Sequence, residues 1–259
     1  MLFKDFRWEM NLNYSKNNNK VVSLTTGVSS IRLAGFISPG IFIMADQPYG
    51  VIWGSRFLRN ENGDILVDDD GFELAATESG PIGNAMPDWI GGIRNTISWK
   101  GLSVSALIDT RQGGDIYNLD EYYTKAYGTS WFTRDRENPI IVKGVRESDG
   151  KVNTTEVTDF RTYWSNNSSI DEANIQDASF IRLRDISLSY ELPKKMLNNK
   201  WIKGLLFSVS GRNIWLKTGD NFTGSDPETS LYGSGNGQGI TNFAVPSSKS
   251  INFALKLTL

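Results

Sequence analysis

The most regular feature of the sequence is an alternation of apolar and polar residues with a period of two. Between Asp5 and Ser15 every odd position is polar or charged, and the even positions are Phe6, Trp8, Met10, Leu12 and Tyr14. Because successive side chains of a β-strand point to opposite faces, this segment predicts a strand with one apolar and one polar face. It is about twice as long as an ordinary strand of ~5–6 residues.

The same alternation recurs along the chain. It predicts further strands over residues 22–28, 93–99, 102–109, 186–192, 205–209 and 250–259, and weaker strands near 50–58 and 140–146. Lys100-Gly101 predicts a tight turn, whereas residues 60–92, 113–177 and 217–247 form long polar segments with little strand signal. Within these segments we expect short helical turns over 120–127 and 160–165.

Long strands joined alternately by short turns and long loops are typical of an antiparallel transmembrane β-barrel. Aromatic residues near the predicted strand ends fit the girdle of such a barrel; they are Trp8, Tyr14, Trp99, Tyr190, Trp201 and Trp215. A soluble β-sandwich is the alternative, but its strands are usually shorter and its turns come about every 8–12 residues. We therefore predict an all-β chain that forms a barrel segment with long extracellular loops.

Composition excludes several kinds of protein. The 259 residues include no Cys and no His, and 27 Lys and Arg oppose 29 Asp and Glu. A Ser-His-Asp triad, a cysteine nucleophile and a disulfide scaffold are therefore excluded, and the near-neutral charge argues against a nucleic-acid partner. No apolar run reaches the ~18 residues of a membrane-spanning helix. Met1–Lys4 leads directly into charged residues, so no export signal is expected here.

Three motifs suggest chemistry that their spacing does not support. Asp68–Gly71 lacks the ligands of a calcium loop at its first and twelfth positions, so a hairpin turn is expected there. Gly233–Gly239 lacks the glycine pattern of a phosphate loop and predicts a flexible loop. Asp109 and Asp115 could pair as acids, but Asp109 lies on a polar strand face and is expected to line a wet lumen. We expect no catalytic residue, metal or cofactor.

Six segments in order along the chain resemble blocks of one family. They are Tyr49–Arg59, Ile82–Ile93, Asp109–Asn118, Phe180–Pro193, Val209–Trp215 and Asp226–Glu228. Together they resemble the C-terminal part of SusC/RagA-type TonB-dependent outer-membrane transporters. The resemblance implies a 22-stranded barrel around an N-terminal plug, located in the outer membrane of a Gram-negative cell. It also implies import of oligosaccharides or peptides together with a SusD-like surface lipoprotein, powered through TonB.

On this resemblance, residues 1–259 are the C-terminal part of the barrel, and the signal peptide, TonB box, plug and early strands are absent. We therefore expect a fragment that does not transport by itself. The last strand carries a stripe that would face lipid and be recognised by the barrel assembly machinery. This stripe is Ile251, Phe253, Leu255, Leu257 and Leu259. The family more often ends in Phe, which predicts weaker recognition.

The long loops are rich in aromatic residues. The candidate ligand-binding residues are Tyr122, Tyr123, Trp131 and Trp164, because aromatic faces can stack on sugar rings. Packing of the loops against themselves is the simpler interpretation for any one of them. Two functions follow: the barrel segment of a nutrient importer, or a soluble all-β glycan-binding module.

Overall fold

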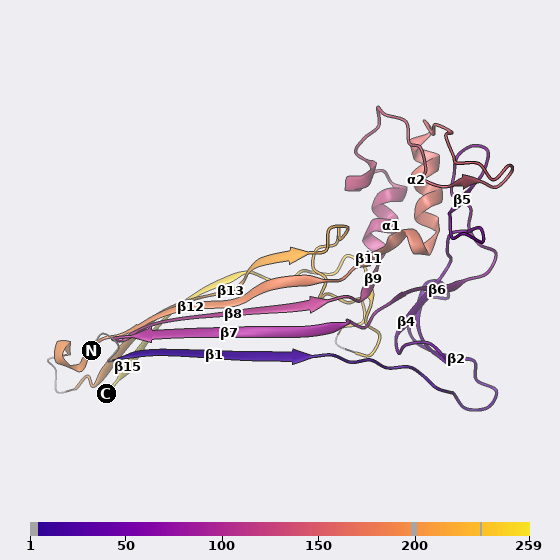
Figure 1. The fold of residues 1–259 in the computed structure, drawn as a ribbon. Coiled ribbons are helices and arrows are strands. Elements are labelled where there is room, and N and C mark those ends of the chain that lie inside the picture. The colour runs from indigo at the N-terminus through magenta and orange to yellow at the C-terminus, as the bar shows by residue number, and fades with distance from the viewer. Residues whose placement is uncertain (1–4, 198–200, 234) are drawn as a thin grey trace.

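The computed structural model describes residues 5–197, 201–233 and 235–259. Long strands run side by side and carry, at one end, a group of short strands and helices (Figure 1). We call this group, which comprises residues 16–88, 113–179 and 219–249, the head. The opposite end holds the start of the first strand and the end of the last strand (Figure 1).

The long strands form one antiparallel sheet, which we call the main sheet. In spatial order its strands are β1 (Phe6–Ser15), β7 (Trp89–Trp99), β8 (Leu102–Gln112), β12 (Phe180–Glu191), β13 (Gly204–Thr218) and β15 (Ser250–Thr258). Each contains a segment predicted from the alternation. Among the described residues, β1 and β15 pair with one neighbour each and not with one another, so the main sheet is open.

The strand register sorts the two faces of the main sheet by polarity. One row across all six strands consists of Trp8, Ile97, Val104, Leu188, Val209 and Phe253. The next row on the opposite face consists of Glu9, Thr96, Ser105, Ser187, Ser210 and Asn252. The apolar face is open to the surroundings, and the Phe253 side chain is 81% exposed.

A two-residue hairpin joins β7 to β8. Lys100 and Gly101 both have positive φ, at 48° and 87°, and Trp99 pairs with Leu102. Two central residues with positive φ define the type I′ turn, whose twist matches that of the flanking strands. The tight turn predicted at Lys100-Gly101 is confirmed, and the three long connections lie at the other end of the sheet, in the head (Figure 1).

Strand β12 contains a β-bulge at Arg184. The register with both neighbouring strands shifts between Leu183 and Asp185. The shift changes which positions are apolar, from odd numbers at Ile181 and Leu183 to even numbers from Ile186 onward. A bulge of this kind re-aims side chains, and here it lets the consecutive residues Arg184 and Asp185 both reach the polar face.

The head is built from short elements. One sheet of the head consists of β2 (Ser30–Gly35), β3 (Gly40–Met44), β4 (Val51–Gly54) and β6 (Gly80–Asn84). A second sheet consists of β9 (Asp115–Asn118), β11 (Ile175–Asp177) and β14 (Ile240–Thr241). A third consists of β5 (Leu66–Val67) paired with β10 (Val145–Arg146). The helices are α1 (Leu119–Ala126), α2 (Phe160–Ser169), η1 (Trp131–Thr133) and η2 (Asp171–Asn174), while η3 (Lys194–Met196) lies between β12 and β13.

The head contains the main apolar core. Ile41, Ile52, Ala85, Tyr117, Leu119 and Ile240 pack together from six different elements or loops. Gly239, at φ 103°, packs so close to Ala85 that a Cβ there would lie 2.6 Å from the Ala85 Cβ. The C-terminal part of the segment predicted as a flexible loop is thus packed against the core. Ser234 of that segment, like Met1–Lys4, lies outside the described residues.

Several local predictions can be compared with the head. Residues 22–28 do not form a strand: the segment ends in a turn at Gly27, and Val22 is 85% exposed, so the alternation has no partner strand. The weaker strands at 50–58 and 140–146 shorten to β4 and β10, and the segment 60–92 contains β5, β6 and the start of β7. The two helical turns are confirmed as α1 and α2, so the chain is mostly rather than entirely β.

Candidate functional site

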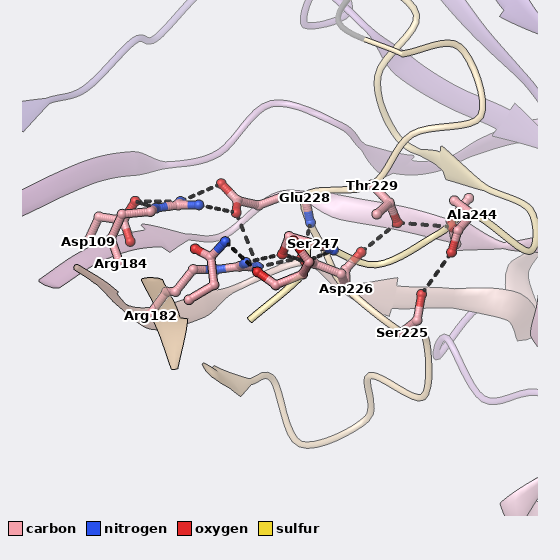
Figure 2. A network of polar contacts seen from close by, with 12 residues as sticks. Asp109, Arg182, Arg184, Ser225, Asp226, Glu228, Thr229, Ala244 and Ser247 are labelled. Carbon is pink, nitrogen blue, oxygen red and sulfur yellow. Dashed lines mark hydrogen bonds and ion pairs between the residues drawn. The ribbon is translucent and has the colours of Figure 1, made fainter. Parts of the chain in front are cut away.

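The polar face of the main sheet carries a cluster of charged side chains next to the head (Figure 2). We call it the polar cluster: Asp109, Arg182, Arg184, Asp226, Glu228 and Ser247. Arg182 on β12 is 1% exposed and donates to Asp226 Oδ1 at 2.5 Å. It also donates to the Ser247 hydroxyl and lies 3.1 Å from Glu228 Oε2. Burial of this guanidinium therefore depends on residues far away in sequence.

Arg184 forms the second arm of the polar cluster. Its Nη2 donates to Asp109 Oδ2 at 2.5 Å and to Glu228 Oε1 at 2.7 Å, and Glu228 therefore joins the two arginines (Figure 2). In the strand register Asp109 of β8 pairs with Arg182, and Arg184 is the extra residue of the bulge, whose side chain reaches Asp109. Asp109 thus lies on the predicted polar face, where its carboxylate is paired.

Asp226 and Ser247 belong to the connection between β13 and β15, so the polar cluster fastens this connection to the sheet. Ser247 donates to Asp226 Oδ2 through its hydroxyl and, at 3.2 Å, through its backbone N–H. Burial acts to raise the pKa of Asp226, but hydrogen bonds from Arg182 and Ser247 outweigh burial and lower the pKa below its ordinary value.

Asp115 is not part of this cluster. Its carboxylate accepts from the Asn84 backbone N–H at 2.8 Å, and burial raises the pKa of Asp115. Asp109 and Asp115 therefore have different partners and different environments. No group of three or more His, Cys, Asp or Glu side chains in the described part of the chain is arranged to hold a metal ion.

A second set of buried polar contacts fixes α1 within the head. Asn118 caps α1 by accepting from the Glu121 N–H, and its side chain donates to Gln176 Oε1 at 2.9 Å. Thr223 donates to Glu121 Oε2 at 2.5 Å and accepts from Gln176 Nε2 at 2.9 Å. The two ends of the 113–179 connection and the start of the 219–249 connection are held together in this way.

A third set of contacts involves residues of the block Tyr49–Arg59. Asp171 accepts from the Ser38 hydroxyl at 2.5 Å and from the Ser55 backbone N–H at 2.9 Å. Arg59 donates to both oxygens of Glu172, at 2.6 and 3.0 Å, and a bidentate pair of this kind has a defined orientation. The 113–179 connection is thereby attached to the loop that follows β4.

A pocket of about 770 Å³ lies between α1 and α2. Its lining includes three of the four predicted ligand-binding residues, Tyr122, Tyr123 and Trp164, which the fold brings together from two helices. Trp131 is not in the lining; it is 66% exposed, and the Arg134 guanidinium lies 3.3 Å from its ring centre. Trp131 therefore lies outside the pocket that the other three residues line.

The aromatic residues of the pocket also contact each other and their neighbours. The rings of Tyr122 and Tyr123 meet edge to face at 5.0 Å, and Tyr123 stacks on Phe243 at 6.1 Å. Trp164 meets Tyr163 edge to face at 4.9 Å. The self-packing expected for the loops is thus present, together with an open pocket.

Sequence reasoning missed the cationic residues of the pocket. Lys125, Arg136 and Arg161 line it. Lys125 is 6% exposed and donates to the Ala173 carbonyl at 2.8 Å, and its burial lowers the pKa of Lys125 while nearby carboxylates oppose that shift. Helical spacing of Phe160 and Trp164 was the signal that could have identified one wall, because residues four apart share a helix face.

The predicted terminal stripe lies on the exposed apolar face. Ile251, Phe253, Leu255 and Leu257 alternate along β15, and Leu259 follows directly after the strand. All five side chains are between 49% and 81% exposed. No helix in the described ranges is long and apolar enough to cross a membrane.

The chain is similar to known proteins along nearly its whole length. TonB-dependent receptors P3 and P26 of Formosa agariphila are each 26% identical to it, over 93% and 98% of this chain, and receptor P39 is 28% identical over 79%. The resemblance to SusC/RagA-type TonB-dependent receptors is confirmed. No protein-family model matches the chain.

Solved structures of the RagAB peptide transporter share the fold. The open-open state of the RagAB peptide importer matches 99% of the chain with a TM-score of 0.72, and another RagAB structure matches 98% with a TM-score of 0.65. Sequence identity is 20% in both. The chain spans 27% of each matched RagAB chain, and about a quarter of TonB-dependent receptors P3 and P26.

Proposed function

We propose that the chain forms the C-terminal part of the barrel of a SusC/RagA-type TonB-dependent transporter, which imports nutrients across the outer membrane. The observation that carries this proposal is the main sheet, with one exposed apolar face and one polar face. A strand row such as Trp8 to Phe253 suits contact with lipid, and the opposite Ser, Thr and Asn row suits a wet lumen.

The two open edges of the main sheet support the same proposal. Each unpaired backbone group costs several kcal/mol within a membrane, so β1 and β15 require partner strands. In the proposed transporter the remaining strands of a 22-stranded barrel provide them. The chain alone would then lack the plug and the TonB contact, and would not transport by itself.

Within this transporter the chain acts passively. The polar face and the head would shape the path of an oligosaccharide or peptide, a SusD-like lipoprotein would meet the head, and lipid would surround the apolar face. The barrel assembly machinery would engage β15, and TonB would act through other parts of the transporter. The chain is proposed to have no catalytic role and no cofactor.

A soluble glycan-binding module is the second candidate, favoured by the aromatic pocket in the head. It requires a layer that covers the apolar face, because a contiguous patch of this extent drives association in water. No such layer is formed by the residues that the structure describes, and the importer is therefore the better interpretation.

Cysteine labelling tests the proposal, because residues 1–259 contain no Cys, and the full-length protein without an introduced Cys is the control for background labelling. Phe253→Cys and Asn252→Cys are introduced into the native gene at its full length, and cells are fractionated. We expect both variants in the outer membrane. A water-soluble maleimide should label Asn252→Cys from the lumen and should label Phe253→Cys only after detergent extraction. Recovery of the native protein in the soluble fraction would overturn the proposal.

A further inference from the structure

We propose that the pocket between α1 and α2 binds a short anionic oligosaccharide. This inference rests on the proposed function and specifies the class of ligand for one site in the head. The volume of about 770 Å³ lies within the range of about 300–1,000 Å³ for pockets that bind small molecules.

The charge of the pocket indicates an anion. Lys125, Arg136 and Arg161 are among its lining residues, and no Asp or Glu is. The acidic residues nearby lie outside the lining: Glu121 and Glu73 act on buried Lys125, and they accept hydrogen bonds, Glu121 from Ser130 and Thr223 and Glu73 from Tyr163 and Asn167. Asp159 caps α2 through the Thr162 N–H and hydroxyl, next to Arg161.

The cations differ in how firmly they are held. Arg136 donates to the Gly128 carbonyl at 2.5 Å and to the Thr133 carbonyl at 3.3 Å, which fixes its side chain across the α1 C-terminus. Arg161 lies in the first turn of α2 and is exposed. A carboxylate or sulfate on the ligand can therefore meet one ordered and one adaptable guanidinium, and such contacts are charge-assisted hydrogen bonds.

The aromatic lining indicates a saccharide. Tyr122, Tyr123, Tyr127 and Trp164 line the same pocket as the cations, and Tyr127 is 78% exposed. An aromatic face presents an apolar surface with a polar edge, which matches the two kinds of surface on a sugar ring.

A peptide fits this pocket less well. Extended peptides are commonly bound by backbone hydrogen bonds to an unpaired strand edge. The pocket is lined by α1, α2 and the segment 127–136, none of which is a strand. The pocket therefore offers no strand edge to an extended peptide, and recognition here depends on side chains, as it does for a charged sugar.

The test measures binding of trigalacturonate to the full-length native protein purified from outer membranes in detergent. Maltotriose is the neutral probe, and triglutamate is the acidic peptide probe. Arg161→Gln removes a pocket cation without removing a hydrogen bond within the head. Arg134→Gln is the matched control, because Arg134 stacks on Trp131 outside the pocket.

We expect trigalacturonate to bind, to weaken about fivefold in Arg161→Gln and to be unchanged in Arg134→Gln. Added salt should weaken it, because screening reduces the attraction of exposed charges. Equal binding of maltotriose, tighter binding of triglutamate, or an unchanged affinity in Arg161→Gln would overturn the inference. Because the sample comes from the outer membrane, these results leave the proposed location intact, whereas a protein missing from that fraction contradicts the proposed function itself.

Discussion

Individual residues of the polar cluster connect parts of the chain that the sequence separates widely. Arg182 is a strand residue that the structure buries almost completely, with Asp226 and Ser247 as partners 44 and 65 positions away. A buried ion pair contributes little net stability against apolar replacements, but breaking it leaves an uncompensated charge. Removal of one partner of the pair is therefore a sensitive test of how the 219–249 connection is attached to the sheet.

Replacing Asp226 alone should be costly. For Asp226→Ala we expect the free energy of unfolding to fall by about 3 kcal/mol, because Arg182 would be left buried and only partly compensated by Glu228. Urea unfolding of the protein in lipid vesicles measures it. Glu228→Gln is the control, because the Glu228 side chain is 35% exposed. It should lower the free energy of unfolding by less than about 1 kcal/mol. An equal effect of both substitutions would contradict the assigned burial.

The attachment should also depend on pH. The folded-state pKa of Asp226 is lowered, so its contribution is complete above the unfolded value of about 3.8 and is lost as pH falls through the lower folded value. We expect amide exchange in residues 219–249 to accelerate below about pH 4 relative to the main sheet, after correction for intrinsic rates. In Asp226→Asn this acceleration of exchange at low pH should disappear. If it persists, another titrating group causes it.

At the level of elements, the main sheet is determined by alternation and by tight turns. The hairpin at Lys100-Gly101 places β7 and β8 in register without a shift over eleven residue pairs. The polar face adds hydrogen bonds across these strands, between Thr96 and Ser105 at 3.0 Å and between Ser98 and Ser103 at 2.9 Å. Cross-strand pairs of this kind stabilise a sheet.

The hairpin should require glycine at its second position. In Gly101→Val a β-branched residue would take a positive φ, and its Cβ would lie 2.5 Å from the Glu191 carbonyl oxygen. We expect a loss of about 2–3 kcal/mol in the free energy of unfolding. Lys100→Asn is the matched control and should be neutral or stabilising, since Asn-Gly favours this turn. A neutral Gly101→Val would contradict the turn geometry.

The apolar face should reject charge in a membrane. For Phe253→Arg on β15 we expect a loss of about 2–4 kcal/mol in the free energy of folding into lipid vesicles. Asn252→Arg, on the opposite face of the same strand, should cost less than about 1 kcal/mol, because in the proposed barrel its side chain faces the lumen. Equal losses of folding free energy in the two variants would show that both faces of β15 have the same surroundings.

At the scale of the whole molecule, an open sheet carries a well-packed head. The head has its own apolar core and is tied to the sheet by the polar cluster, whereas the sheet has exposed apolar residues and two free edges. In the proposed transporter these are the properties of one part of a larger barrel. The chain covers 25% of TonB-dependent receptor P3, which fits that interpretation.

The native product should therefore be longer than the chain. We expect an antibody against the head to detect an outer-membrane protein about four times as long as the 259 residues, and genomic DNA upstream of Met1 to encode further strands and a plug in frame. A native product of 259 residues would show that the chain is a remnant or a separate protein, and transport would then describe its ancestry.

The sequence by itself determined the strands of the main sheet and their faces. Alternation is a local property, so residues such as Phe6 to Tyr14 indicate both the strand and its apolar side before any partner is known. The same holds for the turn at Lys100-Gly101 and for α1 and α2. The order of blocks such as Phe180–Pro193 also carried the family resemblance.

Tertiary structure decided what depends on contacts between distant segments. Residues 22–28 alternate like a strand but have no partner, and Gly233–Gly239 is predicted as a loop but ends against the core because of Gly239. The ion pair of Arg182 with Asp226, and the pocket that joins Tyr122 to Trp164 and excludes Trp131, depend on how loops return to the sheet. A local alternation of residues cannot predict such long-range contacts, because they arise from burial and pairing across the whole fold.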